Sequence, residues 1–181
     1  MLRLILPAML LVLAAAPVAA QEAQCFQNEH FLVIFQDRTD EVGSDFIIRP
    51  PALGKVACTF ETRNGDIRIG EAGDPLHFLG LAGPHLILSR STGPDGDLVI
   101  YDLERSAFNP FIDVRADDEV TIETDRVVFW ERTMTGTETN CPEFSEYTGY
   151  GLGAVIAEER VFEVETRAVT STGKTRCSST Q

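Results

Sequence analysis

Carboxylates are the most abundant side chains in this sequence that could carry chemistry. The chain holds 28 Asp and Glu residues against 15 Lys and Arg residues, and its formal net charge is −13. A pair of carboxylates in the right geometry can cleave a glycosidic bond, and a group of them can bind Ca²⁺. The central part of the chain offers these groups: Asp95, Asp97, Asp113, Asp117, Asp118, Glu119, Glu123 and Asp125.

The spacing of these carboxylates does not match a known site. The PDGD run at 94–97 lacks the DxDxDG spacing of a calcium loop. In so acidic a chain, neighbouring carboxylates are expected in solvated turns. We therefore predict no catalytic, cofactor-binding or metal-ligating residue here. The acidic balance also argues against nucleic acid and anionic membranes as partners.

Histidine and serine give no local catalytic motif. The three histidines are His30, His77 and His85, and none lies in an HxH or HExxH pattern. The fold could still bring His77 and His85 together. No serine lies in a GxSxG pattern, so a serine nucleophile has no local support.

Two glycine-containing segments resemble phosphate or nucleotide motifs only in part. Gly149–Ala154 reads GYGLGA, but it follows a polar loop instead of opening a βαβ unit. Ser171–Thr175 contains GKT and SxxK, but the earlier glycine of a phosphate loop is replaced by Ala168. We interpret the first segment as a flexible connection, with a binding loop as the alternative, and the second as a hairpin turn.

Four cysteines predict two disulfides. They are Cys25, Cys58, Cys141 and Cys177, and an even number in an exported chain favours pairing. Of the three possible pairings we favour Cys25–Cys58 and Cys141–Cys177, each of which could contribute about 3–4 kcal/mol. The alternative is a metal site, but the CxxC spacing of such sites is absent. Pairing also removes a cysteine nucleophile.

The N-terminus predicts export. Residues 1–20 carry one basic residue, an apolar run, and small residues before Gln21, which is typical of a signal peptide. The alternative is an uncleaved membrane anchor, but the run is interrupted by Pro7 and Pro17. We expect residues 21–181 to form a single β domain that is periplasmic or secreted.

The rest of the chain alternates short apolar runs with turn residues, which predicts strands. Asn64-Gly65 and Asp125-Arg126 are expected hairpin loops, 116–118 is an expected turn, and 70–84 is an expected loop with an apolar island at 76–81. Residues 158–167 could also be helical by composition, but we favour a strand. The pattern amounts to about ten strands, at 31–35, 45–49, 56–60, 66–69, 85–89, 97–102, 111–114, 119–124, 127–132, 154–157 and 160–167.

The predicted fold class is therefore all-β, an antiparallel meander in a barrel, a sandwich or a propeller-like arrangement. Asp97–Asp102 is apolar enough to be buried on both faces. If Asp125-Arg126 is the loop, Ile122 opposes Phe129, and Trp130 lies on the face opposite the core. One short helix is expected near 141–147, with Asn140 as its N-cap.

Within the segment 86–132, the sequence GPDGDLVIYDLERSAF resembles the middle of a β-propeller blade. With its NCPE segment at 140–143 and its TGKTRC tail at 172–177, the whole chain is similar to small uncharacterised secreted proteins of Gram-negative bacteria. This resemblance implies a periplasmic location and no known activity.

These observations favour a non-enzymatic exported protein that binds another molecule at the cell envelope. The partner, a protein or a small molecule, and the oligomeric state stay open. The surfaces of interest are 89–97, 70–84 and 133–153. Two alternatives stay open: a β-barrel that carries a small ligand in an apolar cavity, and a hydrolase whose site is assembled only in three dimensions.

Overall fold

The computed structural model describes residues 22–93, 95–105 and 109–181. The expected signal peptide at 1–20 lies outside the described residues and stays a prediction. The described residues form eleven strands and one short helix: β1 (Gln24–Gln27), β2 (Leu32–Asp37), β3 (Ser44–Arg49), β4 (Ile67–Ile69), β5 (Leu76–Ala82), β6 (His85–Ser91), β7 (Gly96–Asp102), β8 (Ile112–Ile122), β9 (Arg126–Thr135), α1 (Phe144–Gly149), β10 (Gly153–Glu163) and β11 (Ala168–Thr180).

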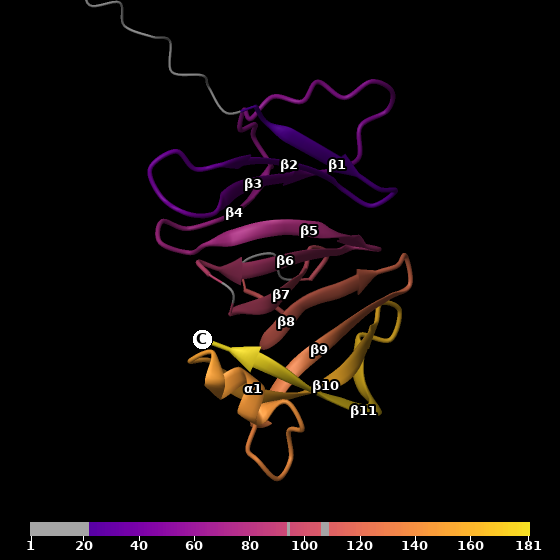
Figure 1. Ribbon diagram of the computed structural model, residues 1–181. Helices are drawn as coiled ribbons and strands as arrows, with labels where there is room; N and C mark the ends of the chain where they lie inside the picture. The colour runs from indigo at the N-terminus through magenta and orange to yellow at the C-terminus, as the bar shows by residue number, and fades with distance from the viewer. Residues whose placement is uncertain (1–21, 94, 106–108) are drawn as a thin grey trace, which may run out of the picture.

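The strands form two antiparallel sheets that follow the order of the chain. β1 to β4 make a four-stranded sheet, and β5 to β11 make a seven-stranded sheet, each with sequential neighbours. In Figure 1 the chain accordingly runs from β1 at the top to α1 and β11 at the bottom. The predicted all-β meander is confirmed. The seven-stranded sheet is not closed into a barrel, because β5 and β11 are its two edges.

The four-stranded sheet packs face to face on the first strands of the seven-stranded sheet. Val33 and Ile48 are cross-strand partners on one side of this core, and Leu88 and Val99 are partners on the other. All four side chains are buried. Since alternate residues of a strand share a face, this contact uses one face of β6 and β7.

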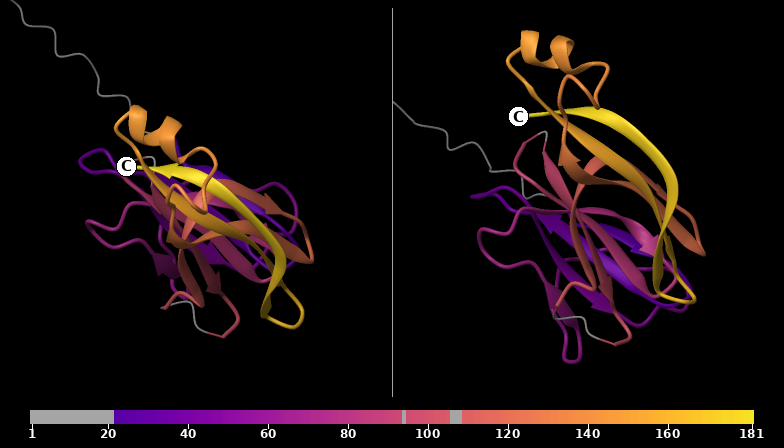
Figure 2. Two further views of the ribbon diagram at one scale, coloured as in Figure 1. Left: turned by 60° about the horizontal axis from the view of Figure 1, so that its bottom comes forward. Right: turned by 90° about the horizontal axis from the view of Figure 1, so that it is seen from below.

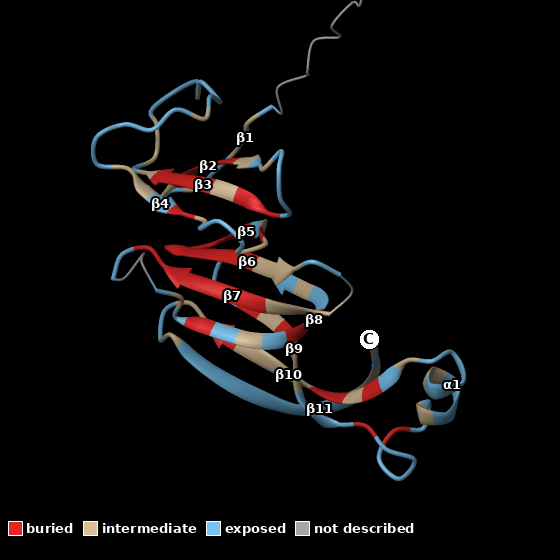
Figure 3. Ribbon diagram, turned by 90° about the vertical axis from the view of Figure 1, so that its left-hand side faces the viewer, coloured by how far each residue is buried: buried red, intermediate tan, exposed pale blue. Residues whose placement is uncertain are grey.

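The second face of β6 and β7 is buried as well. Ile87 and Ile100 pack there with Val127, Phe129 and Phe162 from β9 and β10, so the later strands fold back over the earlier ones. Figure 3 shows continuous buried colouring along much of β6 and β7, whereas β11 is exposed for most of its length. The prediction that Asp97–Asp102 is covered on both faces holds for its apolar residues.

The outer face of the four-stranded sheet is covered by a segment without strands. Val56 and Phe60 pack against Leu32, Ile34 and Ile47, and the Cys25–Cys58 disulfide ties the segment to β1. The predicted strand at 56–60 is therefore wrong. Asn64-Gly65 does form a turn, but it leads into β4, which pairs with β3.

The expected loop at 70–84 contains a strand. Its apolar island is β5, which pairs with β6 through a tight turn at Gly83-Pro84. The pairing shifts register between Phe78 and Gly80, so Leu79 stands out of the ladder as a bulge and is 38% exposed. Gly80 and Gly83, which we read as loop residues, belong instead to a bulged strand and its turn.

The expected turn at 116–118 is also part of a strand. β8 runs without a break, and residues 117–119 oppose Trp130 alone, which is a large β-bulge. The following hairpin loop is Thr124-Asp125, not Asp125-Arg126, so Phe129 opposes Val120 and not Ile122. The shift is two residues, so Phe129 still lies on the core face, as expected.

The C-terminal hairpin also differs from the prediction. β10 is one continuous strand, and its turn to β11 lies at 164–167. The segment Ser171–Thr175 is therefore not a hairpin turn but lies within β11, where residues 172–174 bulge out opposite Glu159. Figure 2 shows β10 and β11 as long bent ribbons, with α1 at one end of the molecule.

The short helix begins later than the predicted 141–147. It spans Phe144–Gly149, and Glu143 precedes it without a side-chain cap. Asn140 accepts a hydrogen bond from the backbone of Thr137 over 2.6 Å, so it organises the preceding turn instead of capping the helix. The Cys141–Cys177 disulfide ties this region to β11.

The two disulfides join the pairs that the sequence favoured, with Cα atoms 5.8 and 5.3 Å apart. Disulfides persist in oxidising compartments, so they indicate an environment outside the cytoplasm. No helix among the described residues is long and apolar enough to cross a membrane.

Candidate binding pocket

The bulge in β8 places two adjacent carboxylates in different environments. Asp117 is 8% exposed, and Asp118 is exposed. Successive side chains of a strand point to opposite sides, and the bulge adds twist that re-aims them. A simple turn would leave both carboxylates in water, whereas the bulge buries Asp117 and leaves Asp118 exposed.

Asp117 is fully engaged by three side chains. Arg132 donates through Nε to its Oδ1 over 2.8 Å. Arg176 donates to its Oδ2 through Nε and Nη2 over 3.0 and 2.7 Å, and Ser178 donates through Oγ over 2.7 Å. Burial by itself raises the pKa of Asp117, but these hydrogen bonds outweigh it and hold that pKa below its ordinary value.

Arg132 extends this network to a third carboxylate. Its Nη1 lies 2.9 Å from Asp95, in the loop before β7. Asp95 also accepts hydrogen bonds from the Thr180 hydroxyl and from the backbone of Gln181. Burial opposes ionisation of Asp95, yet these donors and Arg132 lower its pKa. The network therefore joins the β6–β7 loop, the β8 bulge and the end of β11.

The outer side of the bulge is completed by an aromatic contact. The Arg176 guanidinium carbon lies 4.3 Å from the ring centre of Trp130, which is half-buried on the face opposite Phe129. Glu119 pairs with Arg176 at the surface. These contacts fix the bulge between β9 and β11, and they satisfy the charge of Asp117 from its outer side.

A pocket of about 240 Å³ lies on the inner side of the bulge. Four successive strands supply its walls, so it is concave on several sides. Its apolar walls include Leu79, Leu98 and Val120, and Ser89 is the hydroxyl that lines it. Leu79 reaches it because the β5 bulge turns that residue out of the ladder.

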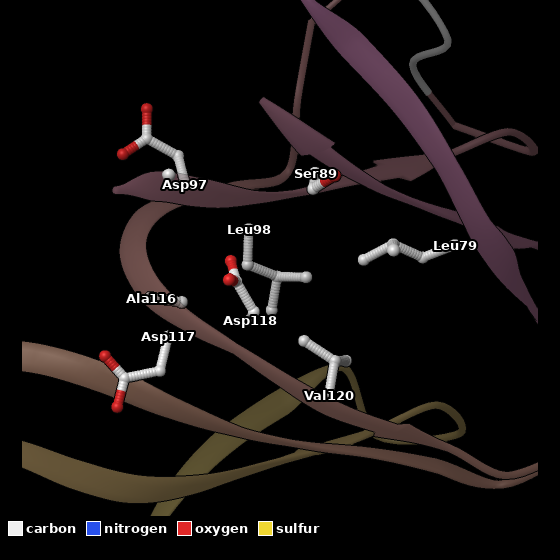
Figure 4. A pocket seen from close by; sticks show the side chains of 9 residues that line it. Leu79, Ser89, Asp97, Leu98, Ala116, Asp117, Asp118 and Val120 are labelled. Atoms are coloured by element: carbon white, nitrogen blue, oxygen red, sulfur yellow. The ribbon is translucent and has the colours of Figure 1, made fainter. Parts of the chain in front are cut away.

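Figure 4 shows how the carboxylates lie around this pocket. Asp118 points in among Leu98 and Val120, whereas the carboxylates of Asp97 and Asp117 point away. Asp97 lies 3.7 Å from Arg90, so it has a positive neighbour. Asp118 is thus the carboxylate that an occupant of the pocket would meet.

Asp118 differs from the other carboxylates singled out in the sequence. Asp113 pairs with Arg90 at 2.7 Å, and Glu123 and Asp125 lie 2.8 and 3.6 Å from Arg126. Of the eight, Asp118 alone has no hydrogen-bond or ion-pair partner in the described part of the chain. Its charge is left unneutralised by the fold.

The histidines do not form a site together. His77 opposes Ser89 and His85 opposes Ala82, so they lie at different ends of the β5–β6 hairpin. His85 does lie 3.9 Å from Asp102, but its side chain is fully buried. Its Nε2 has no hydrogen-bond partner. A histidine–acid pair that water cannot reach does not support the hydrolase hypothesis.

Cys141, Glu143 and Cys177 also lie close enough for a metal site. Both sulfurs are bonded to each other, so neither is a thiolate ligand. This group is therefore structural.

Sequence reasoning missed the pocket because its walls come from two bulges that it read as a loop and a turn. Comparison of the chain with protein-family models, with curated proteins and with solved structures found no match. The pocket and its charges are thus the basis on which function is inferred.

Proposed function

We propose that this protein is a non-enzymatic binding module that works in the periplasm or after secretion, with the pocket beside the β8 bulge as its binding site. One observation carries the proposal: Asp118 points into an apolar pocket and has no partner among the described residues. Asp118 is exposed, so its charge is available to a cationic partner, and no side chain of the described residues competes for it. The disulfides and the predicted signal peptide support the location.

The size of the pocket limits what it binds. Its volume of about 240 Å³ is below the roughly 300–1,000 Å³ of pockets for drug-sized ligands. The space between β6, β7 and β9 is filled by packed side chains, and the sheet does not close. These features favour a small guest at the surface over a large ligand carried inside a barrel.

The pocket lining favours binding over catalysis. Ser89 lines the pocket, but neither His77 nor His85 does, and in the described part of the chain no lining carboxylate is hydrogen-bonded to the Ser89 hydroxyl as a general base would be. A serine nucleophile needs such a base within hydrogen-bond reach. The lining offers apolar contact and charge, which are the means of recognition.

A fragment screen by amide NMR on the mature protein tests the proposal. The screen includes neutral, cationic and anionic fragments with an apolar body, and we expect some of them to shift the resonances of Leu79, Leu98 and Val120. Val120→Phe should fill the pocket and remove these shifts. Val169→Phe, at a position on β11 that is already 44% exposed, should leave them unchanged.

Two results would contradict the proposal. One is the absence of shifts at the pocket with every fragment, and the other is unchanged binding in Val120→Phe. Thermal unfolding of both variants must match the parent protein, so that a lost signal reports a filled pocket and not lost folding.

A further inference from the structure

We propose that the pocket selects a small free amine, in which a protonated ammonium group on a short apolar body pairs with Asp118. This inference rests on the proposed function, because it names the class of ligand for the same pocket.

The charge of the site selects a cation. Asp117 is neutralised by Arg132 and Arg176, and Asp97 has Arg90 nearby, so Asp118 contributes the single unneutralised charge at the pocket. An anion would meet repulsion from Asp118. A neutral guest would cover this carboxylate without replacing its water, which costs free energy. A monocation removes both penalties.

The walls select an apolar body next to that cation. Leu79, Leu98 and Val120 surround the position to which Asp118 points. Asp118 is exposed in the free protein, so the apolar body of a bound guest packed on these walls would be what excludes water, and an ion pair is stronger where water is excluded. A fully hydrated ion such as Na⁺ would gain nothing from these walls, whereas an alkyl or aryl group would bury apolar surface.

The shape of the pocket favours a free molecule over a side chain of a partner protein. The walls come from β5, β6, β7 and β8, so they enclose the guest on several sides. A flat interface would present one face of a sheet. The Asp117 network fixes the bulge from its outer side, so the backbone next to Asp118 is held in place before the ligand arrives.

Three probes of similar size and different charge test this inference: benzylamine, benzyl alcohol and benzoate, titrated into the mature protein and followed by amide NMR. We expect benzylamine to bind most tightly and benzoate least. Asp118→Asn should weaken benzylamine about tenfold or more, because a charge-assisted contact is lost. The matched control is Asp125→Asn, at a carboxylate outside the pocket lining whose side chain is 71% exposed, which should change the affinity less than about twofold.

The outcomes separate the two proposals. If benzyl alcohol binds as tightly as benzylamine, or if Asp118→Asn leaves benzylamine binding unchanged, the amine assignment is overturned while the pocket remains a binding site. If no probe shifts the pocket residues, both proposals fail. If a lysine with blocked backbone termini binds more tightly than benzylamine, a partner's side chain replaces the free amine as the occupant.

Discussion

Asp117 and Asp118 are neighbours in the chain, but one carboxylate is held by two guanidinium groups and the other has no partner among the described residues. The β8 bulge produces this difference by opposing three residues to Trp130. The Asp117 carboxylate holds β8 to its neighbours, and the Asp118 carboxylate points into the pocket. The two residues should therefore respond differently to the same substitution.

Asp117→Asn should lower the free energy of unfolding by about 2–3 kcal/mol, because it leaves Arg132 and Arg176 without a buried counter-charge. Urea denaturation at neutral pH measures this change. The control is Asp118→Asn, which should stay within about 0.5 kcal/mol of the parent because Asp118 has no partner to lose. Equal losses in the two variants would contradict the division of roles between these residues.

His85 should make stability depend on pH. Burial lowers its pKa from the ordinary value of 6.5, and Arg167 adds to this, whereas Asp102, the Ala82 carbonyl and Glu104 act in the opposite direction. Below the unfolded pKa the unfolded chain therefore binds more protons than the folded protein. The free energy of unfolding should then fall as the pH drops below about 6.5.

Urea denaturation at about pH 7.5 and about pH 5.5 measures this effect, since the two values bracket the unfolded pKa of histidine. His85→Gln should reduce the difference between the two values, whatever it does to stability at either pH. His77→Gln is the control and should keep the difference. A parent protein that becomes more stable on acidification in this range would show that the sign is wrong.

The Cys141–Cys177 bridge should stabilise the region around α1. Replacing both cysteines by alanine opens a loop with a sequence separation of 36 and should lower the free energy of unfolding by about 3–4 kcal/mol. Backbone amides around α1 and the end of β11 should then lose protection from hydrogen exchange, whereas those in β2 and β3 should keep it. The double alanine variant at Cys25 and Cys58 should show the reverse distribution.

Arg167 tests whether an ion pair or backbone geometry matters more at the β10–β11 turn. Its φ is 58°, a conformation that glycine adopts more readily. Its Nε also donates to Asp102 over 2.7 Å, and the Asp102 side chain is 4% exposed. We expect Arg167→Gly to destabilise the protein by about 1–2 kcal/mol, because a buried carboxylate without its partner costs more than the relieved strain returns.

Arg167→Lys is the matched variant for this turn. It keeps the charge and the φ but loses the Nε donor, so its loss of stability should be smaller than that of Arg167→Gly. Urea denaturation again gives the comparison. If Arg167→Gly is as stable as the parent protein, the contact with Asp102 contributes nothing.

The sequence predicted strands well where apolar residues are continuous and poorly where the chain bulges. The runs at 31–35 and 97–102 became β2 and β7 because their burial follows from composition alone. The strands β5 and β8 were missed or divided because Gly80 and Asp117-Asp118 carry turn-like residue types. Locally, a bulge and a turn use the same residues, and the neighbouring strand decides between them.

The candidate site was predictable only as a list of carboxylates. Asp117 and Asp118 were named together, but one of the two arginines that distinguish them, Arg176, lies 59 residues further along the chain. That contact depends on the curvature of β8 to β11 and on the pairing of β10 with β11. No local pattern encodes either of these, so the sequence alone could not identify the unpartnered carboxylate.

The strands β6 and β7 lie between two apolar layers, and this position affects how cooperatively the protein unfolds. The four-stranded sheet packs its apolar side chains against one face of these strands, and β9 and β10 pack theirs against the other face. Loss of either layer would expose a side of β6 and β7 that no other element covers. We therefore expect the described part of the chain to melt as one unit, so that separately expressed N-terminal and C-terminal halves would not fold.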